Sequence, residues 1–330
     1  MTQDAESLKQ RIPLLDYLRQ KNWTARQVGA HQEFVGLCPL HPESRPSFYV
    51  NAAKNVFYCH GCGRGGDLIR FVQLSLNLSF RQSVAYLKQQ LGLPELGEED
   101  ALREAADFYQ RQLQRHPEAV DYLHRRGIYA ARLIDQLSIG YAPGGMLHRH
   151  MTELGYPAEL LRRLGLVHQG KDAFYRRIVF PCFDGSRPVN LYGRGLDSAA
   201  PHRFLPRPKG GLYAWNTIRN HPDVILVEGP FDLAVLWQAG FVNTTCAFGV
   251  HLTQAQFSQL SDRSDRAVFI AFDSDLAGRD AARSLAQRLH GSGLNARIVE
   301  LPAGQDPNSY FLSGAPPSDF EARLRRALRL

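Results

Sequence analysis

From residue 224 onward, short apolar runs rich in β-branched residues alternate with segments of helical pattern. The apolar runs are VILV (224–227), NTTCAF (243–248), AVFIAF (267–272) and ARIVEL (296–301), and a helical segment separates each from the next. This alternation predicts a parallel sheet with helices on both faces. Sheets of this kind place their functional groups just beyond the carboxyl ends of the strands.

Acidic residues follow three of these predicted strands. Glu228 comes directly after the first, Asp273 and Asp275 follow the third, and Asp306 follows the fourth. Asp232 lies one helical turn after Glu228, so its side chain can face the same way. Clustered carboxylates repel one another without cations, and oxygen ligands in such numbers suit Mg²⁺ or Mn²⁺. We therefore expect a divalent-cation site, with a helix cap or a turn as the alternative role for any single acid.

A second constellation consists of three cysteines and a histidine. Cys38-x-x-His41 and Cys59-x-x-Cys62 are separated by 17 residues, a spacing typical of tetrahedral zinc with sulfur and nitrogen ligands. We favour His41 over His60 as the fourth ligand because it completes the paired spacing. Four protein ligands predict a structural zinc. A redox CxxC is the alternative, but no thioredoxin-like pattern surrounds the motif.

Basic and aromatic residues surround this motif. Basic groups can track phosphates and exposed rings can stack on unpaired bases, so this region is a candidate DNA-binding face. Alternatively, the rings fill a small core. The residues are Arg45, Phe48, Tyr49, Lys54, Phe57, Tyr58, Arg64 and Arg70.

Two glycine patterns resemble nucleotide-binding motifs but lack their context. Gly61-x-Gly63-x-x-Gly66 overlaps the metal motif, and no acidic residue follows at the distance that a ribose contact needs. In the second pattern, which runs from Gly165 to Lys171, Asp172 replaces the Ser or Thr that holds magnesium. We reject both patterns as nucleotide sites.

Composition narrows the class of protein further. The 330 residues carry a formal net charge of +7, which permits an anionic partner such as nucleic acid. No stretch approaches the roughly 20 apolar residues that span a bilayer, and the N-terminus lacks the apolar core of a signal peptide. We therefore expect a cytoplasmic protein without a membrane partner.

The pattern along the chain predicts a multidomain protein of mixed α/β and α+β class. We expect a small zinc-ribbon domain over 1–93, a linker over 94–104, a mixed α+β subdomain over 105–221, and the parallel-sheet domain over 222–330. Within the first domain, Ser79-x-x-Gln82 predicts a capping box that opens a helix ending near Leu91. The alternative for the linker is the solvated start of a helix.

These motifs resemble the bacterial DnaG-type DNA primases. The zinc motif is similar to their CHC2-type zinc-binding domain. The C-terminal segments VILVEGPFDLAVLWQAG, FGVHLT, FIAFDSDLAGRDAA and LPAGQDPNSYF resemble their Toprim domain. The middle of the chain is also similar, in YLHRRGIYAARLIDQLSIGYAP, RRIVFPCFDG, LYGRGL and HRFLPRPKGGLYAWN. The likeness extends in order over nearly the whole chain.

The resemblance implies an enzyme that synthesises short RNA primers on a single-stranded DNA template by two-metal-ion nucleotidyl transfer from NTPs. It implies that Glu228, Asp273 and Asp275 are catalytic and that Asp232 and Asp306 help to bind the metal. Basic residues implied to hold template or nucleotide phosphates are Arg176, Arg177, Arg194, Arg203 and Lys209. A Toprim nuclease acting on DNA, and a non-catalytic zinc-containing factor that binds single-stranded DNA during replication, remain alternatives.

The chain departs from the family pattern in three respects. The usual Asp-Pro-Asp is Asp306-Pro-Asn308, and Ser274 stands between the two acids of the DxD motif where glycine is common. The helicase-binding domain of full replicative primases is not visible. We therefore expect a short form, monomeric, with an accessory or mobile-element role, for which a replicative helicase would be a partner only in trans.

Overall fold

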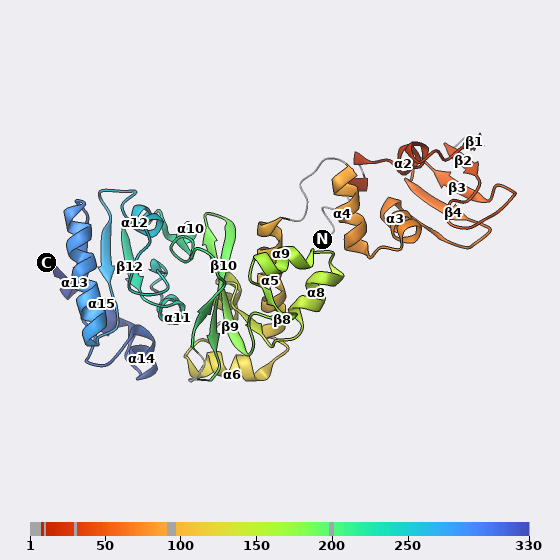
Figure 1. Cartoon of the computed structure of the whole chain (residues 1–330). Coiled ribbons are helices and arrows are strands. Elements are labelled where there is room, and N and C mark those ends of the chain that lie inside the picture. The colour runs from red at the N-terminus through yellow and green to blue at the C-terminus, as the bar shows by residue number, and fades with distance from the viewer. Residues whose placement is uncertain (1–7, 10, 30–31, 91–96, 198–200, 330) are drawn as a thin grey trace. The chain divides into compact units, whose positions relative to one another are not determined.

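The computed structural model describes residues 8–9, 11–29, 32–90, 97–197 and 201–329 and divides into two compact units (Figure 1). One unit comprises residues 1–97 and 149–158, and the other comprises 98–148 and 159–330. Leu91 and residues 94–96 of the expected linker lie outside the described residues. None of the helices in the described ranges is long and apolar enough to cross a membrane.

An antiparallel meander forms the smaller unit. Its strands pair in chain order, β1 (Ala25–Val28), β2 (Glu33–Gly36), β3 (Phe48–Asn51), β4 (Val56–Cys59) and β5 (Gly65–Gly66). Successive side chains of a strand point to opposite faces. Phe48 and Phe57 therefore pack inward, with ring centroids 5.0 Å apart, whereas Tyr49 and Tyr58 pair on the outer face.

The described part of this unit also contains helices α2 (Leu14–Gln20), α3 (Leu68–Leu76) and α4 (Phe80–Gln90). The predicted capping box is present at the start of α4. The Ser79 hydroxyl accepts a hydrogen bond from the Gln82 N–H at 3.3 Å, and the Ser79 N–H donates to the Gln82 side chain at 2.8 Å. Phe71 of α3 packs against Phe57, which ties this helix to the sheet.

The larger unit begins with helix α5 (Glu98–Leu113), so residues 98–104 of the expected linker are helical. An antiparallel sheet of order β11-β10-β9-β6 follows, flanked by further short helices. The elements are α6 (Pro117–Arg125), α7 (Ala131–Gln136), β6 (Gly140–Ala142), α9 (Ala158–Arg163), β9 (Arg177–Asp184), β10 (Arg187–Gly195) and β11 (Arg203–Phe204). Helix α8 (Leu147–Glu153) begins in this unit, and its residues from 149 onward belong to the smaller one.

The Gly165–Lys171 pattern forms a hairpin and not a phosphate loop. Strands β7 (Val167–His168) and β8 (Lys171–Asp172) pair around Gly170, which has a φ of 73°. The Asp172 carboxylate accepts hydrogen bonds at 2.9 Å from the backbone N–H groups of residues 146, 147 and 148. Asp172 therefore caps the start of α8.

The predicted parallel sheet is confirmed. Its order is β13-β12-β14-β15-β16, and β12, β13, β14 and β15 are parallel. The strands are β12 (Asp223–Val227), β13 (Thr244–Cys246), β14 (Ala267–Ile270), β15 (Asn295–Ile298) and the antiparallel β16 (Leu328–Arg329). The helices are α10 (Trp215–Ile218), α11 (Pro230–Gln238), α12 (Gln254–Leu260), α13 (Leu276–Gly291), α14 (Pro307–Leu312) and α15 (Pro317–Arg326).

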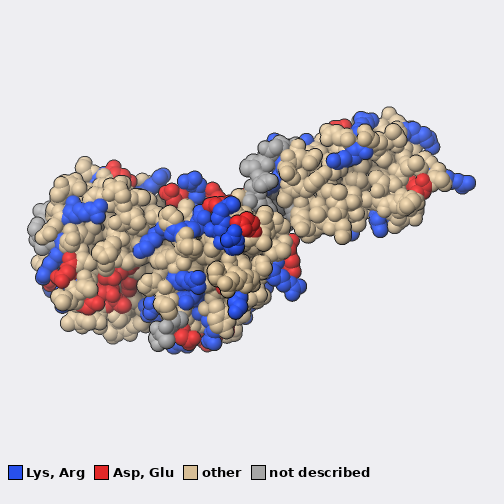
Figure 2. All heavy atoms as spheres, viewed as in Figure 1, with Lys and Arg blue, Asp and Glu red and all other residues tan. Residues whose placement is uncertain are grey.

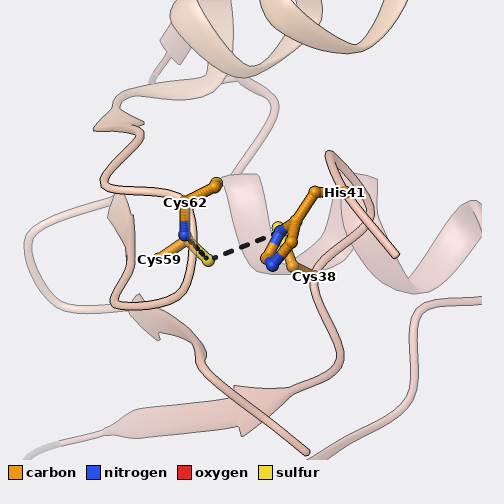
Figure 3. Close-up of side chains that lie close together, drawn as sticks. All are labelled: Cys38, His41, Cys59 and Cys62. Carbon is orange, nitrogen blue, oxygen red and sulfur yellow. Dashed lines mark hydrogen bonds between the residues drawn. The ribbon is translucent and has the colours of Figure 1, made fainter. Parts of the chain in front are cut away.

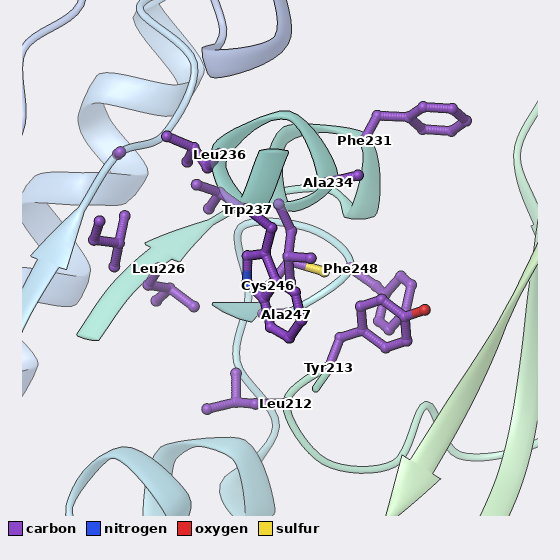
Figure 4. Close-up of a cluster of buried hydrophobic side chains, with 14 of the residues drawn as sticks. Leu212, Tyr213, Leu226, Phe231, Ala234, Leu236, Trp237, Cys246, Ala247 and Phe248 are labelled. Atoms are coloured by element: carbon purple, nitrogen blue, oxygen red, sulfur yellow. The ribbon is translucent and has the colours of Figure 1, made fainter. Parts of the chain in front are cut away.

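One hydrophobic core joins the antiparallel and parallel sheets of the larger unit. Figure 4 shows the part of this core that surrounds α11, including Phe231, Trp237 and Phe248. The ring of Phe180 on β9 lies 5.2 Å from that of Phe231 on α11, and the ring of Tyr213 lies 5.3 Å from that of Phe248. The Tyr213 hydroxyl also donates to the carbonyl of Leu137. The subdomains expected on either side of residue 221 therefore pack as one body.

Candidate functional site

The structure brings together the four residues expected to bind zinc (Figure 3). One ligand atom from each of Cys38, His41, Cys59 and Cys62 lies within 4.8 Å of the others. His41 Nδ1 lies 3.9 Å from Cys59 Sγ, near the separation of about 3.6 Å that tetrahedral zinc with ordinary Zn–S and Zn–N bonds would give. Burial raises the pKa of Cys38 to about 12, so its thiolate needs a neighbouring cation. The donor set fits zinc.

Two tight turns hold the sulfur ligands. The backbone N–H of Leu40 donates to Cys38 Sγ at 3.3 Å, and that of Cys62 donates to Cys59 Sγ at 3.4 Å. Gly63 follows with a φ of 68°, a left-handed conformation that favours glycine. These bonds hold the two sulfur atoms in place within their turns.

His60 belongs to a different surface. Its exposed ring lies 5.2 Å from that of Tyr49 and 5.0 Å from that of Tyr58 on the outer face of the sheet. Tyr58 is 49% exposed, whereas Phe48 and Phe57 are buried. Phe48 and Phe57 therefore fill the core, as the alternative reading of the sequence allowed. The rings of Tyr49, Tyr58 and His60 lie on the outer face, where solvent or a partner can reach them.

At the edge of the parallel sheet, Glu228 and Asp273 meet. Glu228 Oε1 accepts a hydrogen bond from the Asp273 N–H at 3.0 Å. Burial, followed by the charge of Glu228 and the neighbouring aspartates, raises the pKa of Asp273 to about 7. Burial also raises the pKa of Glu228, with the charges of Asp275 and Asp306 acting in the same direction. These shifts are typical of carboxylates gathered without a counter-ion.

Asp275 and Asp306 have a second role as helix caps. Asp275 Oδ1 accepts from the Gly278 N–H at 2.7 Å at the start of α13, and Asp306 Oδ1 accepts from the Ser309 N–H at 2.6 Å at the start of α14. The cap alternative considered from the sequence thus applies to both residues. Capping uses one carboxylate oxygen of each, and both charges still act on Glu228 and Asp273.

Asp232 is the most deeply buried of the five acids. Its Oδ2 accepts from the Gly229 N–H at 3.2 Å and its Oδ1 accepts from the Asn308 N–H at 3.1 Å. Burial, with the charges of Asp306 and Asp273, raises its pKa to about 8. A divalent cation bound by oxygen ligands would offset this repulsion, so the acidic group fits Mg²⁺ or Mn²⁺. Among the described residues, the carboxylate oxygens of these acids do not form a group as compact as that of the four zinc-motif residues, whose ligand atoms lie within 4.8 Å of one another.

Arg126 at the end of α6 is a residue that the sequence reasoning missed. Its guanidinium lies 4.8 Å from the Phe231 ring, and its charge offsets part of the rise in the pKa of Asp232 that burial and the neighbouring aspartates cause. Its carbonyl accepts a hydrogen bond from Asn308 Nδ2 at 2.7 Å. The RRG of the family-like segment YLHRRGIYAARLIDQLSIGYAP was the available signal, but no local rule links it to an acid so distant in sequence.

Strand register brings three of the expected basic residues to one end of the antiparallel sheet. Arg177 pairs with Gly195 and Arg203 pairs with Gly193, and Arg194 lies between these positions on β10. Arg177 donates to the carbonyls of Gly193 and Pro201, and Arg203 donates to that of Ala173 at 3.1 Å. Burial and then the charge of Arg203 lower the pKa of Arg177. Such a pairing of cations favours an anionic ligand.

Lys209 approaches the acidic edge through a loop. Its Nζ donates to the carbonyl of Phe248 at 2.9 Å, and the next N–H, of Gly249, donates to the carbonyl of Glu228 at 2.8 Å. Arg176 lies just before β9, with a φ of 48°. Figure 2 shows acidic side chains gathered on one face of the larger unit, with Lys and Arg side chains beside them.

Three protein-family models match the chain in order. The CHC2 zinc finger matches residues 1–102, the N-terminal domain of the DNA primase catalytic core matches 108–217, and the Toprim-like model matches 225–311. The DNA primase of Aquifex aeolicus is 32% identical over 336 residues, covering 94% of this chain and 66% of the relative. That of Staphylococcus epidermidis is 30% identical, covering 85% and 53%. The chain thus spans between half and two thirds of these relatives.

Solved structures agree with these matches. A crystal structure of the zinc-binding and RNA polymerase domains of Aquifex aeolicus primase has a TM-score of 0.65 and 29% identity, covering 99% of this chain and 86% of that one. A DnaG primase catalytic domain bound to single-stranded DNA has a TM-score of 0.60 and 27% identity, covering 70% and 80%. The ordered zinc, core and Toprim matches show that this chain belongs to the DnaG-type DNA primase family.

Proposed function

We propose that this chain synthesises short RNA primers on a single-stranded DNA template from NTPs. The main support is that the acids following β12 and β14 raise one another's pKa values. The same unit carries Arg177, Arg194 and Arg203 at one end of its antiparallel sheet. Glu228 and Asp273 are joined by a 3.0 Å hydrogen bond, and burial and neighbouring charges raise both pKa values. A nucleotidyl transferase needs such an anionic, cation-binding centre next to groups that hold phosphates.

In this proposal Glu228, Asp273 and Asp275 are catalytic and, with Asp232 and Asp306, bind Mg²⁺ or Mn²⁺. Two cations held by these residues would lower the pKa of an attacking 3′-hydroxyl and stabilise the charge of the leaving pyrophosphate. The Asp273 N–H holds the Glu228 carboxylate in place. The capping bonds of Asp275 and Asp306 hold those two carboxylates in place in the absence of ligand. Their side chains therefore lose little conformational freedom when a cation binds.

The basic residues Arg176, Arg177, Arg194, Arg203 and Lys209 would hold template or triphosphate oxygens. A guanidinium matches phosphate geometry through paired N–H donors. On the zinc module, the outer rings would stack on unpaired template bases. The similar DnaG catalytic domain that was solved bound to single-stranded DNA supports template binding by the core of this chain.

We further propose the functional division expected from the sequence, with a zinc-binding domain over 1–93, a core subdomain over 105–221 and a Toprim domain over 222–330. One structural zinc would hold the first. We propose that the chain acts as a monomer and that any contact with a replicative helicase is made in trans.

A primer-synthesis assay with labelled NTPs, single-stranded DNA and Mg²⁺ tests the proposal. Labelled oligoribonucleotides are the expected product. Shortened DNA would instead indicate a nuclease, and retarded DNA without product would indicate a non-catalytic binder. Cys59→Ala should release zinc.

Asp273→Ala should lower synthesis by at least about 100-fold, because it removes a carboxylate from the metal-binding centre. Asp280→Ala is the matched control, since Asp280 is an exposed acid on α13 and should keep full activity. Circular dichroism should show the same helical content in both variants. Equal activity of the two variants would refute the catalytic assignment.

A further inference from the structure

Glu43 lies between the two zinc-ligand pairs and is surrounded by hydrogen-bond donors. Its Oε1 accepts from the Cys38 N–H at 2.7 Å and from the Ser47 N–H at 3.2 Å. Its Oε2 accepts from the Ser47 hydroxyl at 2.5 Å and lies 3.3 Å from His41 Nε2. The Glu43 side chain is 11% exposed, so few of these bonds can be exchanged for water.

The position of Glu43 bears on which ring nitrogen of His41 carries the proton. An ionised carboxylate only accepts hydrogen bonds, so the Glu43 oxygen 3.3 Å away favours a proton on the ring nitrogen that faces it. A neutral imidazole protonated at Nε2 leaves the Nδ1 lone pair free to bind metal. His41 Nδ1 is the ring atom that lies 3.9 Å from Cys59 Sγ and so faces the other ligands.

We propose that Glu43 is a positioning residue of the zinc site, which holds His41 in the Nε2-protonated form and directs Nδ1 to the metal. Metal-bound histidines usually donate their other ring N–H to a carboxylate, carbonyl or water, and such partners raise metal affinity. Glu43 adds a second effect, because its other oxygen binds the N–H of the ligand Cys38. The Glu43 side chain thereby contacts both a sulfur ligand, Cys38, and the nitrogen ligand, His41.

Ser47 and Gly61 complete this outer layer. The Ser47 hydroxyl lies 3.3 Å from Cys59 Sγ and accepts from the Gly61 N–H at 3.2 Å. A Cβ at Gly61 would lie 2.8 Å from Ser47 Oγ, 2.9 Å from His41 Nε2 and 3.0 Å from Glu43 Oε2. Ser47, His41 and Glu43 therefore fill the space over Gly61, and any larger residue at that point of the Cys59–Cys62 turn would have to displace one of these side chains.

The proposal depends on the zinc motif and not on primer synthesis, so its test measures metal binding. The first measurement is the long-range ¹H–¹⁵N correlation spectrum of His41 in the full zinc-loaded chain. We expect a proton on Nε2 and a metal-shifted Nδ1. A proton on Nδ1 would overturn the proposal whatever the variants do.

The second measurement is zinc affinity, by competition with a chromophoric chelator. Glu43→Gln keeps the size and one acceptor oxygen, but its amide NH₂ would face His41 Nε2 and favour the tautomer that cannot bind through Nδ1. We expect affinity to fall by about 10- to 100-fold. Glu33→Gln is the matched control, because Glu33 is a hydrogen-bonded carboxylate of the same sheet that contacts Asn51, and its affinity should stay within about twofold.

Cobalt substitution separates this role from a purely structural one. Glu43→Gln should still give the absorption of tetrahedral cobalt with three sulfur ligands and one nitrogen ligand, but at higher cobalt concentration. An affinity for Glu43→Gln equal to that of Glu33→Gln would sink the proposal. Primer synthesis plays no part in any of these outcomes, so failure of the proposed enzymatic function would leave them unchanged.

Discussion

Asp232 shows how one buried side chain connects distant parts of the fold. Its two oxygens accept N–H groups from the residue before α11 and from α14, and Arg126, which directly follows α6, supplies a nearby positive charge. A carboxylate in this environment is costly to ionise, because burial and two neighbouring acids oppose the charge. The repulsion among these acids is unfavourable for the folded state, and a cation bound at the proposed metal site would reduce it.

This environment predicts an unusual dependence of stability on pH. The folded-state pKa values of about 8 for Asp232 and about 7 for Asp273 exceed those of an unfolded chain, which lie near about 3.9. Between about pH 4 and pH 8 the folded state binds more protons, so the free energy of unfolding falls as pH rises across that window. In magnesium-free, zinc-loaded protein we expect Tm to be lower at pH 8 than at pH 5, on the order of 5 °C.

Calorimetry of Asp232→Asn checks the cause. This variant should lose part of the difference in Tm between pH 5 and pH 8, and Mg²⁺ should reduce the difference in the wild type. Asp280→Asn should behave as the wild type, since Asp280 is exposed. A pH difference that is the same in both variants would contradict the assignment to Asp232.

At the scale of elements, helix α14 is held to α6 by the side chain at the position that departs from the family pattern. Asn308 is buried and donates from Nδ2 to the carbonyl of Arg126, while its N–H donates to Asp232. An aspartate there would turn an acceptor toward a carbonyl and add a charge beside Asp232. The asparagine is therefore matched to its present surroundings.

Asn308→Asp should destabilise the metal-free chain at pH 8 by about 2–4 kcal/mol, because it buries an unpaired charge. Urea unfolding measures this, and Mg²⁺ should restore part of the loss. Asn243→Asp is the control, since Asn243 also donates to a carbonyl, that of Asp223, but at an exposed site. Equal losses in the two variants would argue against a special environment at Asn308.

The outer face of the zinc-module sheet gives a prediction about template binding. Tyr58→Ala should weaken binding of single-stranded DNA by about 1–3 kcal/mol, the usual contribution of one stacked base. Val56→Ala removes an exposed apolar side chain from the same strand and face and should change affinity little. Fluorescence anisotropy of the full chain with a labelled oligonucleotide compares them, and a loss as large for Val56→Ala would exclude stacking as the cause.

These elements show what the sequence predicted and why. Strands β12 to β15 were predicted because buried parallel strands leave continuous apolar runs. The clustering of Cys38, His41, Cys59 and Cys62 was predicted because their paired spacing is local. Period-two alternation also explains why Phe48 and Phe57 turn inward while Tyr49 and Tyr58 turn outward. Glu43, Arg126 and the Asn308 contact were missed because they act through pairings that only the folded chain creates.

At the scale of the whole molecule, the net charge of +7 should make nucleic-acid binding depend strongly on salt. Each phosphate contact on a single strand contributes about −0.7 to the slope of log affinity against log salt concentration. Arg203→Ala should therefore reduce the slope by about 0.7. Arg288→Ala lowers the net charge equally from α13, where the guanidinium lies over Phe257, and should keep the wild-type slope. Equal slopes for the two variants would indicate a diffuse field instead of a contact at Arg203.

The hydrophobic core that joins β9 to α11 limits how this chain can be recombined with its relatives. A chimera spliced at residue 221 would pair Phe180 and Tyr213 of one parent with Phe231 and Phe248 of another. Mismatched side chains at these contacts would leave cavities or steric overlap in the core. Exchanging residues 98–330 as a block preserves every one of these contacts. The two sheets are therefore expected to be inherited together, as a single unit of descent, although sequence motifs mark them as separate modules.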